Sequence, residues 1–189
     1  LATPAGLSIF AGSRAKPSPL VRLFSFLIPK SEVSIQLDVD GDVLDISVSA
    51  GQAFDANALT RPAAPEAIKT GETDSLVEVP LVKLAWGRSG DKGNKANIGI
   101  IARDPSYLPY IWAALDEAAI AQRFGHFMQA DASLARYYLP GSHAINFLID
   151  DVLGGGGVAS LRNDPQGKAY AQILLDHPIA VPSHIAEAV

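Results

Sequence analysis

Apolar and polar residues alternate most regularly between residues 33 and 48. Apolar residues take every second position in Val33–Val39 and again in Val43–Val48, with Ser, Gln or Asp between them. A two-residue period places one side of a strand in a core and the other side in water. Asp40-Gly41-Asp42 separates the two runs, and glycine readily takes the positive φ of a tight turn. The pattern predicts a β-hairpin with one buried face.

The flanking segments are less regular. Leu7–Phe10 is a short apolar run, and Leu20–Ile28 mixes aromatic and aliphatic residues in a way that favours a strand. Phe54–Ser75 has no alternation and is rich in proline, alanine and polar residues, as linkers often are. We therefore interpret residues 1–75 as a β-rich segment with a hairpin and a linker, and place a domain boundary near residue 75.

Residues 76–189 alternate between strand and helix patterns. Strands are expected at Val77–Trp86, Ala96–Ala102, Ser133–Leu139 and Ala144–Ile149, with a closing strand at Ile179–Val181. Helical spacing covers Tyr107–Phe124, as two helices meeting near Asp116, and Gln166–Leu175. This order predicts an α+β sandwich with helices on one face of a mostly antiparallel sheet.

Composition excludes several classes of function. The formal net charge is -5 and the basic residues form no run, which argues against a nucleic-acid partner. The chain has no cysteine, so disulfides and thiolate chemistry are excluded and a reducing, cytoplasmic location is favoured. Leu20–Ile28 is shorter than the roughly 20 residues that cross a bilayer, so no membrane association is expected. His126, His177 and His184 lack metal-ligand spacing, and no cofactor is indicated.

The segment Gly87–Asn97 carries the richest chemistry. Its glycines allow a close approach to a ligand, and successive backbone N–H groups in such a loop can form an anion-binding nest. The candidate ligand-binding residues are Arg88, Ser89, Gly90, Asp91, Lys92, Gly93, Asn94 and Asn97. The alternative is a solvated hairpin turn in which Asp91 pairs with a lysine.

Four residues outside this segment are further candidates. His143 precedes a predicted strand and could transfer protons near neutral pH as a catalytic residue; the alternative is a histidine bonded to a carbonyl. Gly155 and Gly156, within a run of four glycines, could form a second close-approach loop or a hinge. Arg162 could supply a cation to the same anion, or form a surface ion pair.

Several motifs resemble one known family. WGRSGDKGNKANI (Trp86–Ile98), YLPGSHAINF (Tyr138–Phe147), the four glycines Gly154–Gly157 and SLRNDPQGK (Ser160–Lys168) are similar to the C-terminal domain of acyclic terpene utilisation proteins. The resemblance implies a ferredoxin-like domain over about Val79–Pro182 and a context of citronellol and geraniol catabolism, which runs largely on CoA thioesters. It also implies that residues 1–75 are the remnant of a larger N-terminal domain.

Two hypotheses of function follow. In the first, the ferredoxin-like domain of residues 76–189 belongs to a catabolic protein and binds a small anionic metabolite, such as a carboxylate or a CoA thioester. In the second, it is a non-catalytic module that docks the missing N-terminal domain or a partner chain, or forms a homo-oligomer. Whether the chain is an enzyme stays open at this point.

Overall fold

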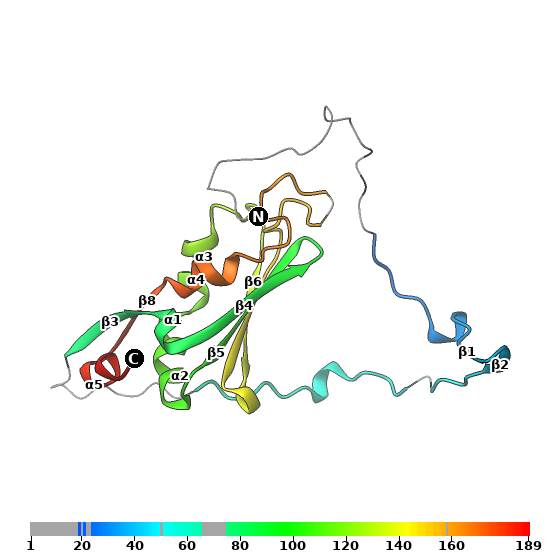
Figure 1. Ribbon diagram of the computed structural model, residues 1–189, viewed down its shortest axis with the longest axis horizontal. Coiled ribbons are helices and arrows are strands. Elements are labelled where there is room, and N and C mark those ends of the chain that lie inside the picture. Colours follow the sequence, from blue (N-terminus) through cyan, green and yellow to red (C-terminus); the bar gives the residue numbers. More distant parts are fainter. Residues whose placement is uncertain (1–18, 20, 22–23, 50, 66–74, 158) are drawn as a thin grey trace.

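The computed structural model describes residues 19, 21, 24–49, 51–65, 75–157 and 159–189. It is an α+β structure with a mostly antiparallel sheet and helices on one of its faces, as the sequence predicts (Figure 1). The described strands form a two-stranded hairpin, a second two-stranded sheet and a four-stranded sheet. The expected apolar run Leu7–Phe10 lies outside the described residues.

The predicted hairpin is present, but its apolar face is not buried. Strands β1 (Gln36–Val39) and β2 (Asp42–Asp45) pair with Leu37 opposite Leu44. Asp40 and Gly41 both have positive φ, at 54° and 95°, which is the backbone of the tight two-residue turns that suit hairpins. Every described residue of the hairpin is solvent-exposed, so the expectation of a buried face is wrong for this chain.

Two short 3-10 turns, Lys30–Glu32 and Ala56–Ala58, are the other regular elements of the described residues before Leu76. The strand expected at Leu20–Ile28 is absent from the described residues 24–28, which are exposed and have no partner strand. Aromatic and aliphatic residues favour a strand only when neighbours pair with them and cover one face.

One predicted strand, Val77–Trp86, divides into three elements. It comprises β3 (Leu76–Pro80), the single-turn helix α1 (Leu81–Leu84) and the start of β4 (Ala85–Lys92). Leu81 and Leu84 are both fully buried, and residues three apart share one face of a helix but not of a strand. β3 pairs with β8 (Pro178–Pro182), which confirms the expected closing strand.

The four-stranded sheet has the order β4-β5-β7-β6, and all its neighbours are antiparallel. Its other strands are β5 (Lys95–Ala102), β6 (Leu134–Leu139) and β7 (Ala144–Ile149), close to the predicted ranges. Ile98, Ile100, Ile145, Phe147 and Ile149 are buried on one face. We call the opposite face, turned away from the helices, the open face.

The core lies between this sheet and a layer of short helices (Figure 1). These are α2 (Leu108–Ala114), α3 (Glu117–Phe124) and α4 (Tyr170–Leu175); α4 begins later than the predicted Gln166. Helix α5 (Ser183–Ala188), which the sequence analysis missed, follows β8. The 3-10 turns Pro105–Tyr107 and Pro140–Ser142 precede α2 and β7.

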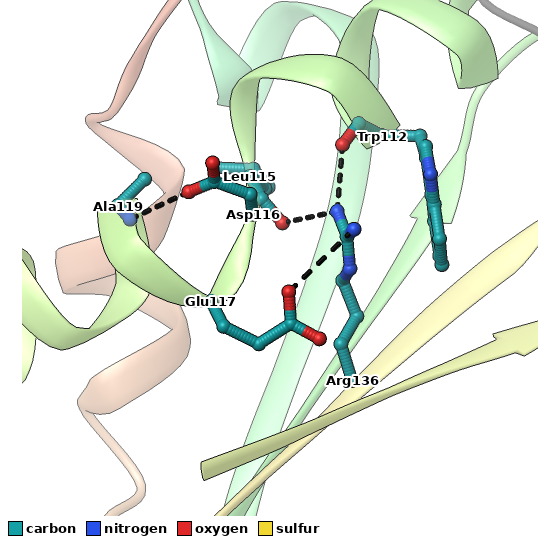
Figure 2. A network of polar contacts seen from close by, with 6 residues as sticks. All are labelled: Trp112, Leu115, Asp116, Glu117, Ala119 and Arg136. Carbon is teal, nitrogen blue, oxygen red and sulfur yellow. Dashed lines mark hydrogen bonds and ion pairs between the residues drawn. The ribbon is translucent and has the colours of Figure 1, made fainter.

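Arg136 of β6 connects the junction of α2 and α3 to the sheet through hydrogen bonds and an ion pair (Figure 2). Its guanidinium donates to the carbonyls of Trp112 (2.7 Å) and Leu115 (2.9 Å), which lie at the end of α2. It also lies 3.6 Å from the Glu117 carboxylate and stacks on the Trp112 ring. Asp116 caps α3 by accepting from the Ala119 N–H, which confirms the predicted meeting point of the two helices.

Candidate functional site

The glycine-rich segment is two paired strands rather than a loop. β4 and β5 pair from Ala85 opposite Ala102 to Lys92 opposite Lys95, so only Gly93 and Asn94 form the turn. Gly87 lies where α4 packs on the sheet. A Cβ at this position would lie 3.1 Å from Ile100 and 3.2 Å from Leu175, so glycine allows the close packing of the helix. Glycines in a polar segment predict a loop, whereas in the structure Gly87 leaves room for a closely packed helix.

Six of the predicted ligand-binding residues line one surface pocket of about 240 Å³ at the β4 edge of the sheet. Its lining residues are Arg88, Ser89, Gly90, Asp91, Lys92, Asn97, Gly99 and Lys168. Arg88, Gly90 and Lys92 alternate along β4, so their side-chain positions share the open face. Gly90 and Gly99 have no side chains, so the backbone itself forms the floor of the pocket at these two positions.

Lys168 contributes a third cation to this pocket. Its ammonium lies 3.1 Å from the position that a Cβ on Gly90 would take, so it reaches the edge of β4. The two ion pairs in the described part of the chain are Lys95–Asp150 and Arg136–Glu117. Arg88, Lys92 and Lys168 therefore have no carboxylate partner among these residues, although Asp91 lines the same pocket.

Ser89 has a structural role. It is 5% exposed, and its hydroxyl donates to the Lys168 carbonyl at 3.1 Å and accepts from the Ala171 N–H at 2.9 Å. The first N–H groups of a helix have no partner within the helix, so Ser89 satisfies one of them for α4. This pair of bonds also holds the segment that carries Lys168 against β4.

Asn94 and the glycine run hold each other in place. The Asn94 side chain donates to Asp151 at 2.6 Å and accepts from the Gly155 N–H at 2.7 Å. Gly156 has a φ of +66°, and a Cβ on it would overlap the Gly93 carbonyl. Gly93, Asn94, Gly155 and Gly156 thus form a contact between two turns, and none of them lines the cationic pocket.

Comparison with known proteins identifies the family of the region that contains the four-stranded sheet. A family model for the AtuA ferredoxin-like domain matches residues 79–180, more than half of the chain. The chain belongs to this family, part of the acyclic terpene utilisation proteins. A search of curated proteins found no match, and neither did a search of solved structures. The matched range of the AtuA ferredoxin-like domain runs from β3 to β8 and includes the whole cationic pocket.

Two other predicted residues of the AtuA ferredoxin-like domain lie away from the pocket. His143 is exposed with a φ of +49°, and its carbonyl accepts from the Ala102 N–H, at the far end of β5 from the β4–β5 turn. The Arg162 guanidinium donates to the carbonyls of Val152 and Phe127, which ties loop segments together. The structure brings neither residue to the cations of β4.

Lys95 and Asp150 form an ion pair next to this site, with 2.8 Å between the ammonium and the carboxylate. The hydrogen bond from Lys95, joined by one from the Ser133 hydroxyl, holds the pKa of the Asp150 carboxyl below its usual value. The same contact with Asp150 raises the pKa of the Lys95 ammonium. Lys95 is therefore paired with a carboxylate, whereas the Lys92 ammonium donates to the Asp91 carbonyl at 2.9 Å.

Two further features bear on function. Among the described residues, no group of three or more His, Asp or Glu side chains is arranged to hold a metal ion. None of the helices in the described ranges has the length and apolar character needed to cross a bilayer.

Proposed function

We propose that this AtuA ferredoxin-like domain binds a small anionic metabolite, with its phosphate or carboxylate group held by Arg88, Lys92 and Lys168. The observation that carries the proposal is the convergence of these three cations on one pocket without a carboxylate partner in the described chain. Arginine presents a planar fork suited to phosphate or carboxylate, and lysine adds a mobile point charge.

The size of the pocket supports a charged group rather than a whole cofactor. Its volume of about 240 Å³ is below the roughly 300–1,000 Å³ of pockets that enclose drug-sized ligands. A CoA thioester would therefore place one phosphate or carboxylate there and leave its remainder outside. In this proposal the chain acts in cytoplasmic catabolism of such metabolites. It needs no proton transfer by His143, so binding is the activity we assign.

The test is a thermal-shift titration of the chain with inorganic phosphate, short carboxylates and CoA, against chloride at matched ionic strength. A ligand at 100 times its dissociation constant adds about 2.7 kcal/mol of stability. We expect the shift to disappear in Arg88→Ala with Lys92→Ala. It should persist in Lys30→Ala with Lys83→Ala, which removes the same charge from exposed positions outside the pocket.

A third variant tests the pocket without removing a charge. Gly90→Ala places a methyl group 3.1 Å from the Lys168 ammonium, which lies at the end of a flexible side chain and can move away. We expect weaker anion binding in a chain that remains folded. The absence of a shift with any anion, or a shift that survives the loss of Arg88 and Lys92, would refute the proposal.

A second candidate function, assembly, is favoured by a different observation. Trp86, Ile101, Tyr137 and Leu139 are large side chains of the open face, and each is between 40% and 53% exposed. Aromatic and aliphatic side chains gathered on one face typically mark a surface that another element covers.

A further inference from the structure

The open face changes from apolar to cationic along its strands. One row across the sheet is apolar and consists of Trp86, Ile101, Ala144 and Leu139. In the next two rows β4 contributes Arg88, and Asn97 and Asn146 form a hydrogen bond, while Leu148 and Tyr137 keep the β7 and β6 side partly apolar. The last row has Lys92 opposite Lys95, whose ammonium is paired with Asp150 just beyond the end of β7. No Asp or Glu occupies an open-face position of these four described strands.

The β1–β2 hairpin changes in the complementary direction. Cross-strand neighbours on one of its faces are apolar: Leu37 lies opposite Leu44, and the Ile46 N–H donates to the Ile35 carbonyl at 2.9 Å. The aliphatic side chains of residues 33–48 are 43% to 56% exposed. Its turn end is acidic, with Asp38, Asp40 and Asp42, and Val33–Val48 contains no Lys or Arg.

The two gradients also match in length. Lys92 lies six positions after Trp86 along β4, or about 20 Å at 3.3 Å per residue. Asp40 lies five positions after Ile35, or about 17 Å at the same rise. An apolar hairpin end placed on the Trp86 row therefore brings the acidic turn to Lys92, which has no carboxylate partner in the described chain. Two sheets with apolar faces pack well face to face at about 10 Å.

We infer that the β1–β2 hairpin of one copy of this chain packs on the open face of a second copy. Both surfaces are exposed in the single chain, and in Figure 1 the hairpin lies well away from the four-stranded sheet. A reciprocal exchange between two copies forms a closed two-fold dimer. In this dimer the hairpin of each copy covers the open face of the other, so both surfaces of both copies are buried. This inference specifies the partner for the assembly candidate and does not depend on anion binding.

The first experiment measures the oligomeric state of the full chain by sedimentation. We expect a dimer that dissociates in Leu37→Thr with Leu44→Thr, and equally in Ile101→Thr with Leu139→Thr. All four side chains are 46% to 56% exposed and threonine favours strands, so the fold should persist, which circular dichroism checks. Leu59→Thr with Leu161→Thr, at 66% and 99% exposed positions outside both surfaces, is the matched control and should remain dimeric.

The second experiment uses the absence of cysteine from the chain. A tagged chain with Ile46→Cys is mixed with an untagged chain with Ile101→Cys and oxidised. We expect disulfide-linked heterodimers in clear excess over those formed when Leu161→Cys replaces Ile101→Cys. A chain that carries both Ile46→Cys and Ile101→Cys should form the link between chains rather than within one.

Each outcome is decisive. A monomeric wild-type chain would refute the inference and leave the assembly candidate only a partner other than a second copy of this chain. A dimer that survives both threonine pairs would refute the hairpin contact while leaving assembly through another surface. A link formed only within single chains would mean that the hairpin docks on its own sheet, and it would overturn the exchange.

Discussion

Ser89 is a polar residue of a glycine-rich segment that serves the fold. Its hydroxyl joins the Lys168 carbonyl to the Ala171 N–H inside the protein. Ser89→Ala leaves the buried Ala171 N–H without its partner, and an unsatisfied buried group costs about 1–3 kcal/mol. We expect urea unfolding to show a loss of stability of that order. Ser31→Ala, at an exposed position, should change it by less than about 0.5 kcal/mol.

Asp150 should link stability to acidic pH. Its bonds with Lys95 and Ser133 hold the pKa of its carboxyl below the value of about 3.9 that an unfolded Asp has. A group with a lowered folded-state pKa stabilises the fold above the unfolded value, and this contribution is lost as pH falls through the folded value. Asp150→Asn should therefore be less stable than the wild type at neutral pH, and the difference should begin to shrink near pH 4 and decrease further as the pH falls through the lower folded-state pKa.

The Lys95 ammonium makes the stability of the fold depend on pH in the opposite direction. Its pKa is raised in the folded chain, so its contribution to stability is present below the unfolded-state pKa and is lost at high pH.

Chemical denaturation from pH 3 to 7 measures the Asp150 effect, with Asp55→Asn, at an exposed position on a different segment, as the control. A constant difference across that range would contradict the role of the ion pair.

Residue identity alone could predict the cations of the pocket only in part. Arg88 and Lys92 stand out because they alternate with Gly90 in one segment. Lys168 lies 76 positions after Lys92, and only the packing of α4 against β4 brings its ammonium to Gly90. His143 and Arg162 look equally promising in the sequence, yet their carbonyl and guanidinium groups bond elsewhere.

At the scale of the element, the packing of β4 explains why its glycines predict a loop although they lie in a strand. A run of glycine and polar residues predicts a loop when each residue is considered alone. In β4, however, Gly87 and Ser89 face the core at points where α4 leaves no room for larger side chains. The strongly periodic segments, such as Ala96–Ala102, were predicted well because alternation reports burial directly. The hairpin at Val33–Val48 alternates too, but none of the described residues covers its apolar face.

The contact between the glycine run and the β4–β5 turn gives a prediction for an element. Gly156→Ala combines a positive φ of 66° with overlap of its new methyl group and the Gly93 carbonyl. Gly157→Ala has a positive φ of 44° but nothing within 4 Å of the new Cβ. The second variant should lose about 1 kcal/mol from the backbone alone, and the first clearly more.

Unfolding curves measure this difference, and hydrogen exchange locates it. We expect faster exchange of the Gly155 and Val152 amides in Gly156→Ala, because Asn94 accepts from both. Equal losses in the two variants would show that the turn-to-turn contact is not tight.

At the scale of the whole molecule, the anion pocket and the hairpin contact share Arg88 and Lys92. An anion bound between these side chains takes charge that the acidic turn would otherwise face. Two ligands that oppose each other at one surface do so reciprocally, each weakening the other by the same factor. If both proposals hold, phosphate should shift the dimer toward monomer.

Sedimentation in phosphate and in chloride of equal ionic strength measures this effect, because general screening acts on both salts alike. We expect the phosphate-specific shift to be absent from Arg88→Ala with Lys92→Ala, since that variant lacks the shared cations. Reciprocally, dilution of the wild-type chain should tighten its apparent affinity for phosphate. Dissociation that depends on ionic strength alone would mean that the two sites act independently and that the acidic turn does not lie over the pocket.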